Sequence, residues 1–130
     1  MKKYIIGEIK KICGNVGVLP NGWCFFIYRH LEYVYIPSED DMIRISIPHV
    51  VNSKECKKDE VDAAVNETNR EVKFIKAMVL NNGSISLNYD YRTGNEENVG
   101  EVVPHMIQTL FGAAEYMKGK LQIKKNMKNV

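Results

Sequence analysis

Lys76 is the residue of this chain whose neighbours most suggest covalent chemistry. It lies between Phe74 and Met78 on one face of a predicted strand, and an amine held among apolar side chains can lose its proton and act as a nucleophile. In the more common arrangement, the aliphatic stem lies on the sheet and the ammonium reaches water or an acid, here over the ring of Tyr89. We therefore expect a structural role for Lys76.

The other reactive side chains show no spacing that supports catalysis or metal binding. The cysteines and histidines are scattered along the chain: Cys13, Cys24 and Cys56, and His30, His49 and His105. They lack the close ligand pairs of a zinc site, and the histidines have no nucleophile or carboxylate at a fixed distance. The acidic run 39–41 lacks the spaced oxygen ligands and the glycine of a calcium loop. We therefore predict no catalytic residue, no metal and no cofactor.

Asn66 and Asn69 are candidate structural polar residues. They lie three residues apart on one side of a predicted helix, so their amides could bond backbone groups of a neighbouring loop or strand. Recognition of a ligand is the alternative. We predict the backbone-bonding role for both.

The helix that carries these asparagines is predicted by apolar residues at helical spacing. They are Val61, Ala64, Val65, Thr68 and Val72. The helix begins between Lys54 and Glu60, with Ser53 and Asp59 as alternative N-caps.

A β-hairpin follows over 73–91, because Asn82-Gly83 is the strongest short signal for a two-residue type I′ turn. Counting outwards from such a loop pairs Leu80 with Ile85. One face of the hairpin is then nearly all apolar and faces the core. The other face carries a small apolar strip, which we predict to be an interaction surface that another chain or the first helix covers: Ile75, Ala77 and Val79.

The first half of the chain predicts one helix and three strands. The isoleucine-rich segment 4–16 fits a helix that stops at Gly14, although a strand is the alternative. The aromatic run from 23 to 36 predicts two strands that reverse at Arg29-His30. The alternation over 42–47 predicts a third strand, ended by Pro48.

The last predicted element is a core helix over 98–118. Pro104 requires either a kink or a regular helix that begins only near Val103. The element order predicts an α+β domain with a five-stranded antiparallel sheet, in which a three-strand meander, a helix and a hairpin lie between an N-terminal and a C-terminal helix.

Charge divides the chain into a body and a tail. Five lysines and no acid lie in 118–130, so residues 1–117 carry 13 basic and 16 acidic groups. We predict a single domain over 1–117 and a basic, frayed tail over 118–130. No stretch approaches the ~20 apolar residues of a membrane span. Three widely spaced cysteines are typical of a reducing compartment, so we expect a cytoplasmic protein without a membrane partner.

The pattern N-x-x-N-R-x-x-K-x-x-K from Asn66 to Lys76 resembles the YbjN family, together with the meander that closes in RISIP, the hairpin and the terminal helix. The fold of that family is similar to that of type III secretion chaperones. The resemblance covers roughly residues 1–117. It implies a small soluble domain that pairs into dimers and binds other proteins as a chaperone-like or regulatory module, with no cofactor and no established active site.

Three classes of function follow. We favour a non-catalytic protein-interaction module that forms a homodimer, because the sheet offers more apolar surface than three helices cover. Binding of single-stranded nucleic acid is an alternative, by base stacking on strand aromatics with the lysine tail on phosphates. Those aromatics are Trp23, Phe25, Tyr28, Tyr33 and Tyr35. The acidic body and the lack of an RNP-like motif argue against it, and an unrecognised enzyme is the third class.

Overall fold

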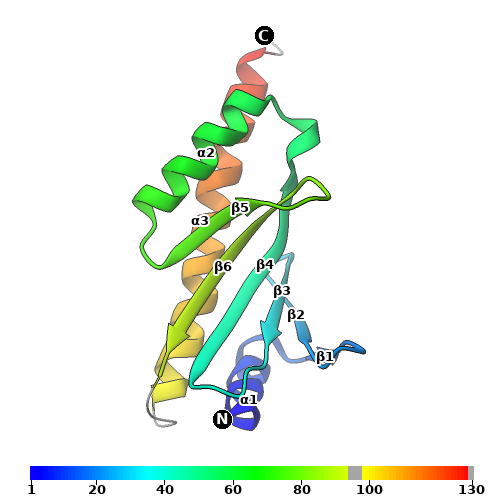
Figure 1. The fold of residues 1–130 in the computed structure, drawn as a ribbon, viewed down its shortest axis with the longest axis vertical. Coiled ribbons are helices and arrows are strands. Elements are labelled where there is room, and N and C mark those ends of the chain that lie inside the picture. Colours follow the sequence, from blue (N-terminus) through cyan, green and yellow to red (C-terminus); the bar gives the residue numbers. More distant parts are fainter. Residues whose placement is uncertain (94–97, 129–130) are drawn as a thin grey trace.

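The centre of the fold is a sheet of six antiparallel strands in the order β1-β2-β3-β4-β6-β5 (Figure 1). The computed structural model describes the backbone of residues 1–93 and 98–128 and the side chains of residues 1–93 and 98–121. The strands are β1 (Gly17–Val18), β2 (Cys24–Tyr28), β3 (Leu31–Ile36), β4 (Met42–Asn52), β5 (Ile75–Val79) and β6 (Ser84–Arg92). The helices are α1 (Lys2–Cys13), the short 3-10 helix η1 (Ser53–Glu55), α2 (Lys58–Glu71) and α3 (Val99–Lys128).

The predicted α+β class is confirmed, but the predicted count of five strands is wrong. The additional strand is β1, which a tight turn folds back onto β2. In this turn the Leu19 N–H donates to the Trp23 carbonyl, and the Gly22 N–H donates to the Leu19 carbonyl. Two residues are too few to show an alternating pattern, so the sequence does not reveal this strand.

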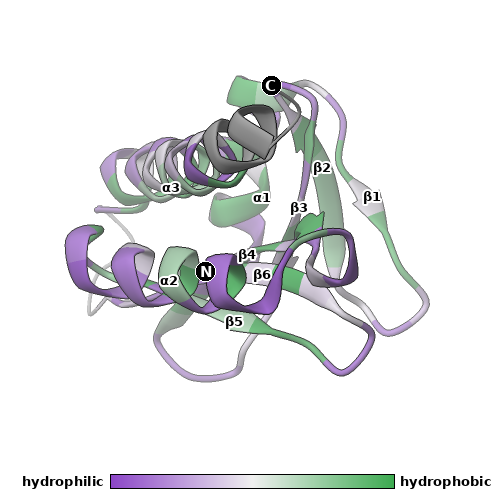
Figure 2. Cartoon of the chain, turned by 90° about the horizontal axis from the view of Figure 1, so that it is seen from above, coloured by the Kyte–Doolittle hydropathy of each residue, from purple (hydrophilic) through white to green (hydrophobic). Residues whose placement is uncertain are grey.

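The α-helices α1, α2 and α3 pack against the same face of the sheet (Figure 2). The core lies between that inner face and the helices. One cross-strand row shows how completely the inner face is covered, because all five members are buried: Cys24, Tyr35, Ile45, Tyr89 and Ile75. Side chains alternate along a strand, so the neighbouring row faces away from the helices.

The segment at the start of the chain forms a helix and not a strand, because Ile5 and Ile9 fall on one side of α1 and are buried. The helix ends at Gly14, whose N–H donates to the Lys10 carbonyl. Gly14 has a φ of 81°, a left-handed conformation that glycine adopts at little cost. The predicted stop is confirmed.

The β2–β3 hairpin reverses at Arg29 and His30, as predicted. Their φ values of 48° and 72° are both left-handed, as a type I′ turn requires. The Arg29 guanidinium lies over the rings of Tyr28 and Phe111, 5.5 and 5.2 Å from their centroids. These cation–π contacts hold the turn against α3.

β4 continues past Pro48, so the predicted end of this strand is wrong. Ile47 pairs with Leu87, whereas Val51 pairs with Ile85, and the register shifts between the two pairs. Such an irregularity leaves Pro48 out of the hydrogen-bond ladder and lets the strand resume beyond it.

The β5–β6 hairpin forms, but its register differs by one residue from the predicted register. The Leu80 N–H donates to the Ser84 carbonyl and the Gly83 N–H donates to the Leu80 carbonyl. Three residues therefore form the loop, and the last of them, Gly83, has a φ of 91°. Val79 and not Leu80 pairs with Ile85. A shift of one residue moves the side chains of β5 to the opposite face of the sheet.

Neither predicted N-cap is used by α2, which begins at Lys58 with Lys57 as its cap. Ser53 belongs to η1 instead. Asp59 lies in the first turn of α2, where a negative charge is favourable beside the positive end of the helix dipole.

α3 begins at Val99, so Pro104 lies inside the helix. The alternative prediction, a helix that begins only near Val103, is wrong. The helix continues to Lys128, and Leu121 is buried in the core. The predicted boundary between 117 and 118 therefore falls within a helix. Three of the five tail lysines have side chains outside the described residues.

Candidate functional site

The face of the sheet opposite the helices is the candidate functional site, and we call it the helix-free face. Its central row crosses five strands: Phe25, Val34, Ser46, Asn88 and Lys76. Phe25 and Ile27 on β2 and Met78 on β5 are exposed here, whereas Val34 and Ser46, which lie between them, are buried. Large apolar side chains thus project near both ends of the face, and the smaller side chains between them project less far into solvent.

A hollow of about 400 Å³ opens on the helix-free face beside β5. Its lining residues are Ile36, Arg44, Phe74, Lys76, Met78, Asn88 and Asp90. Arg44 and Asp90 are cross-strand partners, yet neither they nor Lys76 form an ion pair with any described side chain. The hollow therefore combines apolar walls with charges of both signs.

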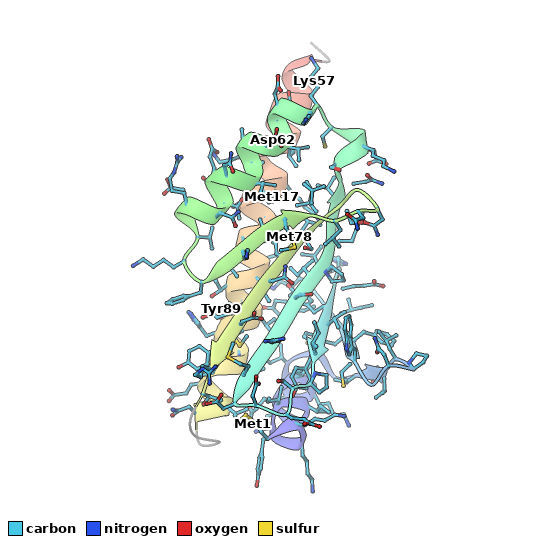
Figure 3. The ribbon with its side chains drawn as sticks, viewed as in Figure 1. Met1, Lys57, Asp62, Met78, Tyr89 and Met117 are labelled. Atoms are coloured by element: carbon cyan, nitrogen blue, oxygen red, sulfur yellow. The ribbon has the colours of Figure 1, made fainter. Side chains whose placement is uncertain are left out.

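Phe74 lies at the rim of this hollow in a strained conformation. It has a φ of 70°, which is rare for a bulky side chain, and 70% of its surface is exposed. Its ring stacks on the ring of Tyr89 at a centroid distance of 5.8 Å. Figure 3 shows the positions of Tyr89 on β6 and of Met78, which also lines the hollow, on β5. Burial raises the pKa of the Tyr89 hydroxyl.

The predicted interaction strip is corrected by the observed register. Ile75 and Ala77 are 5% and 4% exposed and belong to the core beneath the helices. Val79, at 45%, is the exposed member. Lys76 and Met78 lie on the helix-free face instead, because β5 is shifted by one residue relative to β6.

The two asparagines of α2 differ in what they contact. Asn69 makes the backbone bonds expected from its position: the Ala77 N–H donates to its Oδ1 at 2.6 Å, and its Nδ2 donates to the Ala77 carbonyl at 3.1 Å. Asn66 is exposed, and its side chain makes no hydrogen bond within the described part of the chain. Lys76 is exposed at the hollow, opposite Asn88 and not opposite Tyr89.

A serine and a histidine near the β5–β6 loop have the geometry of a nucleophile and a base. Nδ1 of His49, on β4, lies 2.8 Å from Oγ of Ser84, at the start of β6. His49 is exposed and Ser84 is half-buried. A third group that orients the histidine is part of such catalytic arrangements, and no carboxylate is bonded to His49 among the described residues. The described part of the chain contains no group of three or more His, Cys, Asp or Glu placed to hold a metal ion.

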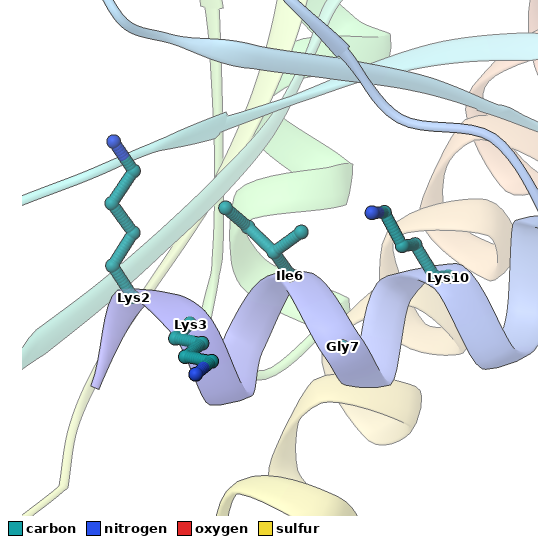
Figure 4. A pocket seen from close by; sticks show the side chains of 5 residues that line it. All are labelled: Lys2, Lys3, Ile6, Gly7 and Lys10. Atoms are coloured by element: carbon teal, nitrogen blue, oxygen red, sulfur yellow. The ribbon is translucent and has the colours of Figure 1, made fainter.

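A second hollow, of about 460 Å³, lies on the outer side of α1. Lys2, Ile6 and Lys10 project on one side of the helix, with Lys3 turned away and Gly7 leaving space between them (Figure 4). Its polar groups are lysine ammoniums alone, so it lacks the opposed charges that distinguish the hollow beside β5.

Part of the helix-free face was visible in the sequence and part was not. The alternation over 42–47 places Arg44 on the outer side of its strand, as observed. The predicted two-residue loop would turn Met78 toward the core, whereas the observed three-residue loop places it on the helix-free face. Phe74 follows α2 after a short connection, and no sequence signal reveals its left-handed backbone.

No family model matches the chain, and no curated protein matches it. The resemblance of the segment from Asn66 to Lys76 to the YbjN family stays a prediction. Within the described residues, no helix is long and apolar enough to cross a bilayer.

Proposed function

We propose that this chain is a non-catalytic protein-interaction module, a chaperone-like protein or regulatory adaptor of the cytoplasm, that acts as a homodimer through its helix-free face. The observation that carries the proposal is the sheet itself, which has helices on one face and exposed Phe25, Ile27 and Met78 on the other. Large exposed apolar side chains on a sheet face that no helix covers suit an interaction surface in a soluble protein.

A second copy of the chain suits this face for two reasons. A two-fold interface joins the same patch on both subunits, so the patch must complement itself. The hollow offers Arg44 and Lys76 together with Asp90, which allows opposite charges to meet across such an interface. The edge of β5 could also pair with a second copy. However, the Asn69 side chain already bonds the N–H and the carbonyl of Ala77, the central residue of β5.

Light scattering tests the dimer. At micromolar concentration we expect a mass of twice the 14.9 kDa of the chain. Phe25→Asp and Met78→Asp, at opposite ends of the face, should each weaken dimerisation by about tenfold or more, because each buries a charge in the interface. Tyr4→Asp is the matched control, since Tyr4 is exposed on α1, away from the sheet.

Two results would count against the proposal. A monomeric mass at every concentration would exclude the homodimer. A dimer that tolerates both face substitutions as well as it tolerates Tyr4→Asp would place the interface elsewhere.

Binding of single-stranded nucleic acid has less support. Tyr33 and Tyr35, two of the five aromatics predicted to stack on bases, are buried beneath the helices. Trp23 and Phe25 are the large aromatics exposed around β2. Two exposed rings at one edge of the sheet provide a shorter stacking platform than the predicted five.

A further inference from the structure

β5 is an edge strand, and its hydrogen bonds to β6 show which of its backbone groups face outwards. The Leu80 N–H donates to the Ser84 carbonyl. In an antiparallel ladder, alternate residues bond to the neighbouring strand, so Met78 and Lys76 also bond to β6. The N–H and carbonyl groups of Ile75, Ala77 and Val79 therefore point away from the sheet.

Such an edge is a template for another strand. The sequence of β5, IKAMV, is apolar except for its lysine, which is the composition that favours strand pairing between chains. An antiparallel pair of two β5 strands centred on Ala77 is also self-complementary, because Ile75 of one copy is then opposite Val79 of the other. The edge thus fits a second copy of itself.

Asn69 occupies the centre of this edge. Its Oδ1 accepts from the Ala77 N–H at 2.6 Å, and its Nδ2 donates to the Ala77 carbonyl at 3.1 Å. A residue of a neighbouring antiparallel strand would present the same pair, one acceptor and one donor, to the same two groups. The side-chain amide therefore bonds the two backbone groups of Ala77 that a neighbouring strand would otherwise bond.

We propose that Asn69 is an intramolecular clip that prevents β5 from pairing edge to edge with β5 of a second copy. In the pairing centred on Ala77, the N–H and carbonyl of one Ala77 would bond the carbonyl and N–H of the other. Asn69 already holds both groups, and α2, which packs beside β5, keeps its amide in place. The clip acts at the edge and is independent of the helix-free face proposed above.

The test compares Asn69→Ala with Asn66→Ala. Both remove an asparagine from an exposed position of α2, but only Asn69 is bonded to β5. The probe is a fluorescent synthetic peptide with the sequence FIKAMVL, residues 74–80. We expect Asn69→Ala to bind it at least about tenfold more tightly than the parent chain and to show a larger mass and an infrared band of intermolecular β-structure. Asn66→Ala should behave like the parent chain.

A second variant separates strand pairing from aggregation after unfolding. The Val79 N–H points to the free edge, so Val79→Pro removes an edge donor without removing a bond to β6. We expect Asn69→Ala/Val79→Pro to lose the peptide affinity and the additional mass. If Asn69→Ala is folded by circular dichroism and keeps the parent's mass and peptide affinity, the proposal is overturned. It is equally overturned if Val79→Pro leaves the additional mass of Asn69→Ala unchanged.

Discussion

Raising the pH from about 10 to about 12 is expected to destabilise this protein strongly, because unfolding then lets buried tyrosines ionise. Burial raises the pKa of Tyr35 to about 12 and raises the pKa of Tyr33 as well. Between the ordinary pKa of tyrosine, about 10, and these higher values, the folded state holds more protons than the unfolded state. The free energy of unfolding therefore falls as the pH rises through this range.

The expected loss is large compared with the stability of a small domain. A shift of about two pKa units at Tyr35 corresponds to roughly 2.7 kcal/mol, and small domains have free energies of unfolding of about 5–15 kcal/mol. Tyr33 adds to this loss, because its hydroxyl is buried and has no hydrogen-bond partner among the described residues. Nothing described beside that oxygen would stabilise a phenolate by a hydrogen bond.

Urea unfolding followed by circular dichroism, repeated at several pH values, measures this dependence. Lysines also titrate in this range, so the informative quantity is the difference between matched variants. Between about pH 10 and about pH 12, Tyr35→Phe should reduce the fall in unfolding free energy by about 2 kcal/mol, whereas Tyr4→Phe, at an exposed position of α1, should leave it unchanged. A Tyr35→Phe profile parallel to that of the parent chain would contradict the assignment.

The sequence predicted those features that depend on a few neighbouring residues. The helix stop at Gly14 needs one residue without a Cβ. The reversal at Arg29-His30 needs two residues that tolerate left-handed φ between two strong strand segments. Both are local choices, and tertiary contacts reinforce them without deciding them.

The register of β5 could not be obtained in the same way. The run Asn81-Asn82-Gly83 closes a hairpin either as a two-residue type I′ loop or as a three-residue loop that ends in a left-handed glycine. Both loops place Gly83 at positive φ, so the local signal does not separate them. Packing decides, because the observed register places Ile75 and Ala77 beneath α2 and α3.

The helix-free face is equally hidden from local patterns. Tyr33 and Phe25 are both aromatic residues in strands, yet one is buried and the other exposed. The side that α1, α2 and α3 cover distinguishes them, and that choice depends on contacts between residues far apart in the chain. The same holds for Asn69: its position on α2 suggested a backbone bond, but only the fold identifies Ala77 as the partner.

Adjacent substitutions in β5 should therefore have very different effects on stability. Ala77 is 4% exposed and Met78 is 37% exposed. Ala77→Asp places a carboxylate in the core and is expected to cost about 4 kcal/mol or more, close to complete unfolding of a small domain. In the monomer, measured below the concentration at which the proposed dimer forms, Met78→Asp keeps its charge in solvent and is expected to cost about 1 kcal/mol or less.

Urea unfolding of the two variants reads the register of the hairpin directly. In the alternative register, with Leu80 paired to Ile85, Met78 would face the core and Ala77 the opposite side, so the order of the two effects would be reversed. Leu80→Asp is a third test of the register. Only the alternative register turns Leu80 toward the core with Met78, so only in that register would Leu80→Asp strongly lower the free energy of unfolding. A folded Ala77→Asp beside an unfolded Met78→Asp would thus reject the observed register, and with it the position of the hollow that Lys76 and Met78 line.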